Sequence, residues 1–244
     1  MSQTVKRATE IIELIADGPR TLNDVARHFD VHPSTAFRQL QTLEQAGFLI
    51  HRSDRTYDIG TRIISLGQQA LDRLDLRRIA HNEIQGLQRR VGHTIHLAQL
   101  LEDSVVYVDK VETTDGVRMY SRIGRPVRLT CTGVGKVVLA TLPVPRRDAL
   151  LRDTDWTAFT KTTHTSRESL DVELNEIQAR GWGVDNGEFE DFVNCIAAPI
   201  TNSTGAIIGA LSITSIKMVS PLDQLKTHLD DLLNTVANIS RDLG

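Results

Sequence analysis

The sequence predicts an α+β protein with an N-terminal winged helix-turn-helix, a linker helix and a C-terminal domain whose antiparallel sheet is flanked by helices. Three observations support this. Short capped helices and a basic hairpin follow one another in residues 1–60, a helical pattern fills residues 61–76, and β-type segments mixed with helices fill residues 77–244. A chain of 244 residues has room for two such domains.

The composition excludes several classes of protein. With 40% hydrophobic and 24% charged residues the chain resembles a globular protein, and its net charge of −3 means that any DNA binding must depend on local groups. Two cysteines, Cys131 and Cys195, exclude a disulfide-stapled fold and indicate a reducing compartment. Polar residues interrupt the apolar stretch 196–216, and residues 1–10 lack a signal-peptide core. We therefore expect a cytoplasmic protein that does not contact membranes.

The first sixty residues carry the signals of a helix-turn-helix. A helix over Val5–Ala16 is followed by a capping box that begins at Thr21, which starts a second short helix. Pro33 opens a third helix at a position where its missing N–H costs nothing, and Gly47 ends that helix. Two short helices joined by a tight turn are typical of this motif.

The third helix predicts a DNA-reading face. At about 100° per residue, Ala36, Phe37 and Leu43 lie on the side of Leu40 and are expected to reach the core. The opposite side forms a stripe without carboxylates, in which Arg38 suits guanine and glutamine suits adenine. The stripe contains Ser34, Thr35, Arg38, Gln41, Thr42 and Gln45.

A basic hairpin follows the third helix. Strands over residues 48–52 and 56–59 enclose a polar turn, which predicts a wing whose Arg52, Arg55 and Tyr57 contact phosphates. The residues that we expect to bind DNA are Thr21, Ser34, Thr35, Arg38, Gln39, Gln41, Thr42, Arg52 and Arg55.

The alternative interpretation is a generic small helical domain with a polar outer face. Residues 1–60 hold seven Lys/Arg and eight Asp/Glu, so net charge does not favour DNA binding. The order of the elements favours it, because a capped helix, a proline-started helix and a basic hairpin follow one another as in a winged helix.

The linker helix over residues 61–76 has two interpretations. It packs on its own domain, or it supports the dimerisation that a two-fold DNA site requires.

The C-terminal region predicts strands and helices of an antiparallel sheet. A capping box at Thr165 starts a helix that runs to Arg180, and Pro221–Leu243 forms one amphipathic helix. A turn at residues 202–205 joins two strands directly, which favours antiparallel pairing. The strand candidates are residues 94–101, 105–108, 117–123, 194–200 and 206–214.

A glycine-bearing turn at residues 130–136 leads into a further helix. Its free backbone N–H groups and the positive end of the helix dipole suit a carboxylate. It fails as a nucleotide-binding Walker loop, because one residue separates Gly133 from Gly135 and Val137 follows the lysine.

Together these residues resemble the IclR family of bacterial transcription regulators over nearly the whole chain. The resemblance implies a GAF-like effector domain, homodimers or dimers of dimers, and palindromic double-stranded operators. Within the family, the chain resembles the subgroup that responds to 2-keto-3-deoxygluconate in pectin and uronate catabolism. The matching motifs are residues 31–35 and 43–49 in the winged helix, Gly124 with residues 132–140, Asp185 with residues 195–200, Gly205 with residues 210–213, and, for the subgroup, residues 94–97, 103–107, 117–125 and 185–186.

The resemblance also implies an effector pocket for a small organic acid. Met119 and Val127 would form apolar walls, the Gly133 and Val134 amides would hold the carboxylate, and Asp185, Cys195, Ser212 and Thr214 would complete the site. Such a set suits a keto acid with hydroxyl groups. Two positions depart from the family pattern: Gly116 replaces a large apolar residue, and Phe192 replaces a glycine.

We expect a ligand-controlled repressor that is not an enzyme and needs no cofactor or metal. Pyruvate, glyoxylate or an aromatic acid are alternative effectors. A cysteine enzyme using Cys195 with His96 or His164 and Asp185 is the rival class, but a thiol inside an apolar strand is usually inert. A metal held by His93 and His96 is disfavoured, because their spacing does not converge on a strand.

Overall fold

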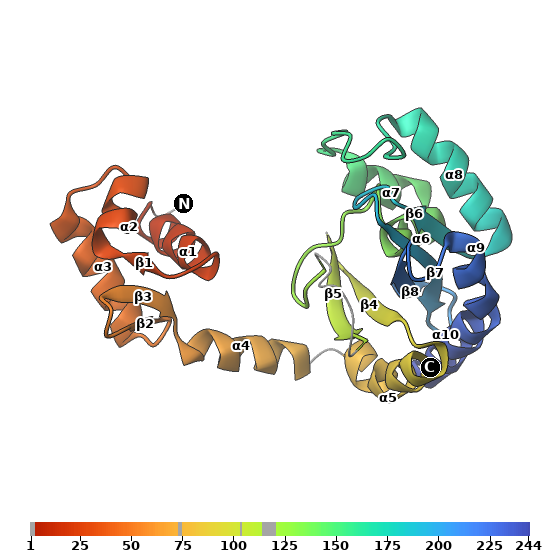
Figure 1. Ribbon diagram of the computed structural model, residues 1–244, viewed down its shortest axis with the longest axis horizontal. Helices are drawn as coiled ribbons and strands as arrows, with labels where there is room; N and C mark the ends of the chain where they lie inside the picture. The colour runs from red at the N-terminus through yellow and green to blue at the C-terminus, as the bar shows by residue number, and fades with distance from the viewer. Residues whose placement is uncertain (1–2, 73–74, 103, 114–120) are drawn as a thin grey trace. The chain divides into compact units, whose positions relative to one another are not determined.

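The computed structural model describes residues 3–72, 75–102, 104–113 and 121–244, which form two compact units divided between Arg73 and Leu74 (Figure 1). Gly116, Met119 and most of the strand expected over residues 117–123 lie outside the described residues, and residues 121–123 are not a strand. No helix of the described chain is long and apolar enough to cross a membrane.

The N-terminal unit is a winged helix-turn-helix, as the sequence predicts. Its strands form one antiparallel sheet in the order β1-β3-β2. The short β1 was not predicted, because two residues carry no periodic signal; it pairs Arg20 with Tyr57. The elements are α1 (Gln3–Ala16), β1 (Arg20–Thr21), α2 (Leu22–His28), α3 (Pro33–Gln45), β2 (Leu49–His51), β3 (Thr56–Ile59) and α4 (Thr61–Asp72).

The predicted helix signals are present. The Thr21 side chain accepts from the Asp24 amide, and the Asp24 side chain accepts from the Thr21 amide, which makes a complete capping box. Pro33 is the first residue of α3. Gly47 follows the α3 cap with a φ of +77°, a conformation that glycine adopts without strain.

Two side-chain predictions for this unit are wrong. Phe37 is 45% exposed, because the core beneath α3 is already filled by Ala36, Leu40 and Leu43. Tyr57 is 4% exposed and packs in the same core, so it cannot contact phosphates as expected of a wing residue. Alternation along β3 directs Tyr57 inward, while its neighbours are only partly buried.

The linker helix expected over residues 61–76 is shorter than predicted. Helix α4 ends at Asp72, and a separate helix α5 (Asp75–Val91) begins the C-terminal unit. Leu76 is 1% exposed and belongs to the core of that unit. The leucines of both helices continue one apolar pattern, which hid the break between them.

The C-terminal unit contains a five-stranded antiparallel sheet with the order β5-β4-β8-β7-β6, which confirms the predicted sheet type. The turn after Thr201 is also as predicted: the Asn202 amide donates to the Ala206 carbonyl at 3.0 Å, and Gly205 has a φ of +78°. Strand β6 was missed because its sequence, Gly-Val-Asp-Asn, contains residue types that are uncommon in strands. The strands are β4 (Thr94–Leu101), β5 (Ser104–Val111), β6 (Gly183–Asn186), β7 (Val193–Thr201) and β8 (Ile207–Ile216).

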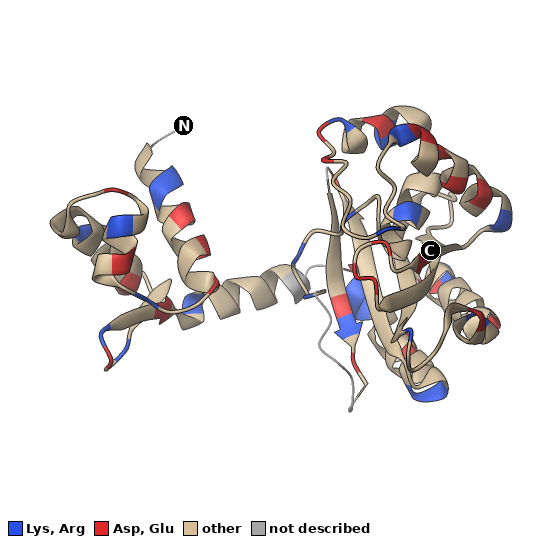
Figure 2. Ribbon diagram, turned by 45° about the horizontal axis from the view of Figure 1, so that its top comes forward, with Lys and Arg blue, Asp and Glu red and all other residues tan. Residues whose placement is uncertain are grey.

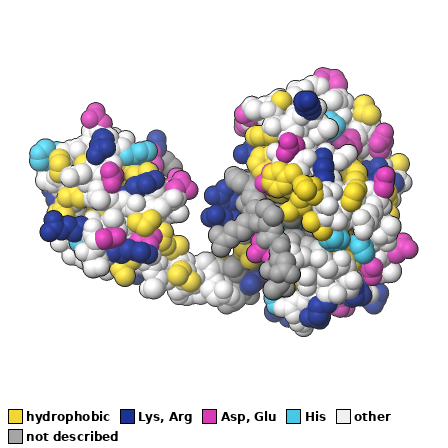
Figure 3. Space-filling view, in the orientation of Figure 1, with side chains coloured by type: hydrophobic (Ala, Val, Ile, Leu, Met, Phe, Trp, Pro, Cys, Tyr) yellow, Lys and Arg dark blue, Asp and Glu magenta, His cyan; other side chains and the backbone are white. Residues whose placement is uncertain are grey.

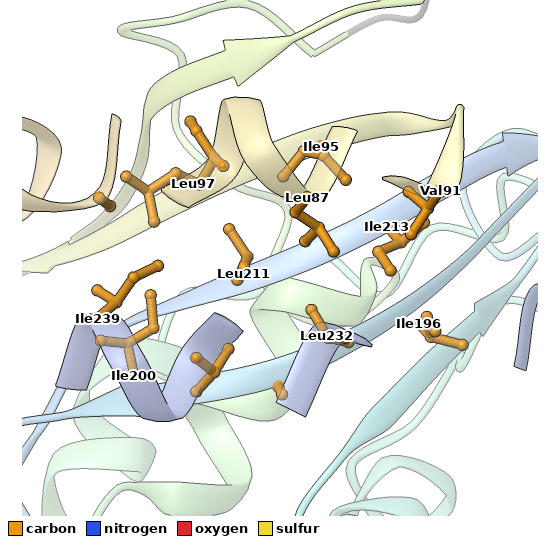
Figure 4. Packing of buried hydrophobic residues seen from close by; sticks show 14 of the residues in the cluster. Leu87, Val91, Ile95, Leu97, Ile196, Ile200, Leu211, Ile213, Leu232 and Ile239 are labelled. Atoms are coloured by element: carbon orange, nitrogen blue, oxygen red, sulfur yellow. The ribbon is translucent and has the colours of Figure 1, made fainter. Parts of the chain in front are cut away.

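Helices cover both faces of this sheet (Figure 1). Helices α5 and α10 pack on one face, where Figure 4 shows Leu87 of α5 beside Ile95, and Ile239 of α10 beside Ile200. Helix α6 packs on the other face, with α8 against it. Strands β7 and β8 are therefore buried on both sides, which explains their nearly continuous apolar sequences. The helices are α6 (Gly133–Thr141), α7 (Val144–Leu151), α8 (Arg167–Arg180), α9 (Leu222–Leu225) and α10 (Leu229–Asp242).

Two helix boundaries differ from the predictions. The cap of α8 is Ser166, whose side chain accepts from the Ser169 amide, and not Thr165. The single helix expected over Pro221–Leu243 is divided, because a 3-10 turn at Lys226–His228 separates α9 from α10. The short α7 was not predicted.

Candidate DNA-reading face and effector pocket

The outer face of α3 presents the polar stripe that the sequence predicts. Ser34, Arg38, Gln41, Thr42 and Gln45 are exposed. The guanidinium of Arg38 forms no hydrogen bond or ion pair in the part of the chain that the structure describes, and is therefore available to a partner. Thr35 is half-buried.

Several residues of the predicted DNA-binding set already have hydrogen-bond partners or are turned inward. The Ser34 hydroxyl lies 2.8 Å from His32 Nδ1, and the Thr42 hydroxyl donates to the Arg38 carbonyl at 2.8 Å. Gln39 is half-buried, and its Oε1 is buried without a partner. The Thr21 hydroxyl donates to Asp24 Oδ2 at 2.7 Å. On the wing, Arg52 forms an ion pair with Asp58. These bonds compete with any contact to DNA.

One arginine of the wing turn is exposed. Arg55 lies at the tip of the turn between β2 and β3, where its φ is +66°. Figures 2 and 3 show basic and acidic residues interspersed over the N-terminal unit, so the basic character of the face is local.

The C-terminal unit contains a pocket of about 620 Å³, including its open mouth, between the sheet and the start of α6. Six of the eight predicted effector residues line it. Val127 is buried in the neighbouring core instead, and Met119 lies outside the described residues. Phe192, one of the departures from the family pattern, is 42% exposed and is not part of the lining. The lining residues are His96, Tyr107, Ser121, Arg125, Pro126, Arg128, Thr132, Gly133, Val134, Asp185, Phe189, Glu190, Val193, Cys195, Ser212 and Thr214.

The start of α6 is packed closely against the sheet. A Cβ on Gly133 would lie 2.4 Å from the Cys195 sulfur, so only glycine fits there. The Gly133 amide bonds this sulfur, and the Gly135 amide donates to the cap residue Thr132 at 3.2 Å. The Val134 amide lies in the same first turn, where amides have no partner within the helix. This helix start can receive an anion.

Burial shifts the pKa values of two groups opposite the helix start far from their ordinary values. Burial, followed by the nearby Glu188, raises the pKa of Asp185 to about 7, although its Oδ1 accepts from the Glu188 amide at 2.8 Å. Burial and the charge of Lys110 lower the pKa of His96 to about 3. A neutral imidazole offers one donor and one acceptor.

The hydroxyl groups of the pocket surround His96. One ring nitrogen, Nδ1, lies 3.0 Å from Thr214 Oγ1, and Nε2 lies 2.6 Å from Ser121 Oγ. Ser212 Oγ is 3.4 Å from Thr214 Oγ1. The sequence predicted Ser212 and Thr214 on one strand face, and the structure directs both into the pocket. This arrangement can bond the hydroxyl or carbonyl groups of a ligand.

An ionic cluster centred on the buried Lys136 lies beside the pocket. The fully buried Lys136 lies with Nζ 2.8 Å from both carboxylate oxygens of Glu173 and 2.5 Å from Glu188 Oε1, and His164 Nε2 lies 2.6 Å from Glu173 Oε2. Burial alone would lower the pKa of Lys136, but Glu188 and Glu173 raise it. The cluster joins α6 and α8 to the loop that follows Asp185. His164 and the two glutamates bring three ligand atoms within 4.8 Å of one another, but the Lys136 ammonium already binds both carboxylates.

The geometry of the pocket disfavours cysteine catalysis. Burial, followed by Asp185, raises the pKa of Cys195 strongly, so its thiolate is not favoured. Both nitrogens of His96 bond hydroxyls, and His164 bonds Glu173. His93, the other histidine considered for a metal, contacts the His228 ring at 5.4 Å between centroids.

Sequence reasoning missed Tyr107, Arg128 and Phe189 as pocket residues. Alternation along β5 could have found Tyr107, since it shares a face with the buried Val105. Arg128 and Phe189 lie in loops, which carry no such period.

Comparisons with known proteins identify both units. The IclR helix-turn-helix domain matches residues 4–52, and the C-terminal domain of the bacterial transcriptional regulator IclR matches residues 68–241. The chain belongs to the IclR family. It is a DNA-binding transcriptional regulator with an effector domain, and it is not an enzyme.

Individual relatives of this IclR-family regulator match it over nearly the whole chain. It is 32% identical to the HTH-type transcriptional regulator KdgR of Escherichia coli, over 91% of this chain and 85% of that one. The crystal structure of Thermotoga maritima IclR is 31% identical, with a TM-score of 0.85 and 100% of both chains covered. An IclR homologue from Microbacterium hydrocarbonoxydans, complexed with 4-hydroxybenzoate, shares the fold at 23% identity, with a TM-score of 0.83 and 99% of both chains covered.

Proposed function

We propose that this regulator is a repressor that binds a palindromic operator as a homodimer or dimer of dimers and responds to a sugar acid such as 2-keto-3-deoxygluconate. The observation that carries the effector proposal is the joining, in one pocket, of an anion-receiving helix start with buried hydroxyl groups. The 32% identity to KdgR supports the resemblance to that subgroup.

For the operator, α3 supplies the base contacts. Arg38, Gln41 and Thr42 are exposed on one face, with Ser34 and Thr35 at its start, and a helix of this kind fits the major groove. Arg55 contacts a phosphate from the wing. Contacts by Thr21, Gln39 and Arg52 require their present bonds or burial to change, so they contribute less.

For the effector, the first turn of α6 receives the carboxylate through the Val134 amide, with the Gly133 amide shared with Cys195. Ser212 and Thr214 bond the hydroxyl groups, and the neutral form of Asp185 donates to the keto or hydroxyl oxygen. Each interaction matches a group that the lining offers, and a keto acid with a hydroxylated tail uses all of them.

Regulation requires that the acid bind the two states of the regulator with different affinity. A coupling of about 1–3 kcal/mol lowers operator affinity by about 5- to 150-fold. In this proposal the acid favours the state that does not bind the operator.

The test has two steps. An operator is first selected from a random duplex library with the full chain, and its binding is then followed by fluorescence anisotropy while an acid is added. The acids are 2-keto-3-deoxygluconate, D-gluconate, pyruvate, glyoxylate and 4-hydroxybenzoate. We expect the hydroxylated sugar acids to release DNA at the lowest concentration. Release by only pyruvate, glyoxylate or 4-hydroxybenzoate would contradict the sugar-acid assignment, and increased DNA binding would contradict repression relieved by the effector.

A further inference from the structure

An arginine at the pocket lies against a pair of phenylalanine rings. The guanidinium carbon of Arg128 lies 4.6 Å from the ring centroid of Phe159 and 4.7 Å from that of Phe189. The two rings meet edge to face, with centroids 5.0 Å apart. Cation–π attraction to both rings restricts the position of the guanidinium.

The two loops that carry these rings are themselves tied together. The Thr160 hydroxyl donates to the Gly187 carbonyl at 2.6 Å, and the Thr163 hydroxyl donates to the Glu188 carbonyl at 2.5 Å. Glu188 is in turn held by Lys136. Both rings, and the cation that lies against them, are therefore on loops tied to each other and to Lys136 of α6.

The donor groups of Arg128 are unused. Its guanidinium forms no hydrogen bond or ion pair with any other described residue, although its carbon lies over two aromatic rings. The N–H groups that point away from the rings remain open, and guanidinium N–H groups bind a carboxylate bidentately. The residue also lines the pocket, together with the start of α6.

We propose that Arg128 is a second anion-binding point of the effector pocket and that the effector is a hydroxylated diacid. One carboxylate binds the first turn of α6, the other binds the guanidinium edge of Arg128, and the hydroxyls between them meet Ser212 and Thr214. This inference rests on the proposed organic-acid function and replaces its monoacid, 2-keto-3-deoxygluconate, with the corresponding diacid. A monoacid leaves the Arg128 donors to water and gains nothing from the stacked cation.

The test uses matched acids that differ only at one end. D-glucarate has a second carboxylate where D-gluconate has a hydroxymethyl group, and 2-keto-3-deoxyglucarate is related in the same way to 2-keto-3-deoxygluconate. Isothermal titration of the full chain should show each diacid binding at least about tenfold more tightly than its monoacid, the range expected of a charge-assisted bidentate pair.

Variants separate anion binding from loop support. Arg128→Gln should weaken diacid binding by about 10- to 100-fold and change monoacid binding by less than about twofold. Arg128→Lys keeps the charge and should retain part of the preference. Arg122→Gln is the matched control, because it removes an exposed arginine of the same segment that does not line the pocket.

Each outcome decides between the proposals. If both acids of each pair bind equally to the natural protein, the organic-acid function stands and the diacid inference is overturned. If Arg128→Gln weakens both acids equally, Arg128 only supports the loops, and the inference is overturned. If none of the four acids binds, the sugar-acid function fails, and the diacid assignment fails with it.

Discussion

Replacing Asp185 with asparagine should stabilise the C-terminal unit at alkaline pH and less so in acid. Burial and the neighbouring Glu188 raise the pKa of this carboxyl from 3.8 to about 7. Between these two pKa values the folded protein holds a proton that the unfolded chain releases. Stability from this group is therefore complete below about pH 4 and is lost as the pH rises to about 7.

The magnitude follows from the two pKa values. Each pKa unit corresponds to about 1.4 kcal/mol, so a rise from 3.8 to about 7 means that ionised Asp185 costs the fold about 4 kcal/mol at pH 8. At pH 5 the same cost is about 2 kcal/mol. Asparagine has no charge to desolvate and can still accept from the Glu188 amide through its side-chain oxygen. Its advantage over aspartate should therefore grow by about 2 kcal/mol from pH 5 to pH 8.

Urea unfolding followed by tryptophan fluorescence measures this difference. Both tryptophans of the chain, Trp156 and Trp182, lie in the C-terminal unit, so the signal reports that unit alone. Asp191→Asn is the control, because Asp191 is an exposed carboxyl in the same loop region. An equal effect of Asp185→Asn on the free energy of unfolding at both pH values would refute the argument.

Three further substitutions test other parts of the structure. Arg38→Ala should reduce discrimination between the selected operator and random DNA by about 1–3 kcal/mol in anisotropy titrations, while effector affinity is unchanged. The control Arg27→Ala, which removes an arginine on α2, should leave this discrimination intact. Equal losses in both variants would contradict the assignment of α3 as the DNA-reading face. Gly133→Ala should lower the free energy of unfolding of the C-terminal unit, measured with urea, by about 1–3 kcal/mol, because its Cβ would lie 2.4 Å from the Cys195 sulfur. Adding Cys195→Ala should recover part of this loss. If the double variant recovers nothing, this contact is not the cause. Lys136→Met should cost about 3–5 kcal/mol at pH 8 and less at pH 5, since the buried Glu188 and the half-buried Glu173 lose their cation and can take up protons in acid. A loss independent of pH would point to packing alone.

Local signals predicted much of the fold. The capping box at Thr21, the proline at the start of α3 and the glycine after it each depend on neighbouring residues only, and all three are present. The helical angle was less reliable for Phe37, because the angle gives the direction of a side chain but does not tell whether the core has room for it. The break between α4 and α5 was missed since apolar spacing continues through it.

The pocket was predictable only in part. Spacing along β8 places Ser212 and Thr214 on one face, and the structure directs them into the pocket with Asp185 and Cys195. The cluster of Lys136 with Glu173 and Glu188 joins residues 37 and 52 positions apart, which no local pattern reveals. The same holds for Arg128, whose aromatic partners come from two other loops.

The two faces of strand β4 have different neighbours: one lines the pocket, and the other packs in the core beneath α5. His96 faces the pocket, while Ile95 and Leu97, one residue to either side, pack in the cluster that includes Leu87 of α5. Because α5 is the first helix after the N-terminal unit, the strand that lines the pocket also packs against the helix at which the chain enters the C-terminal unit. A shift of β4 on the pocket side would therefore press directly on this entry helix through side chains that are already in contact.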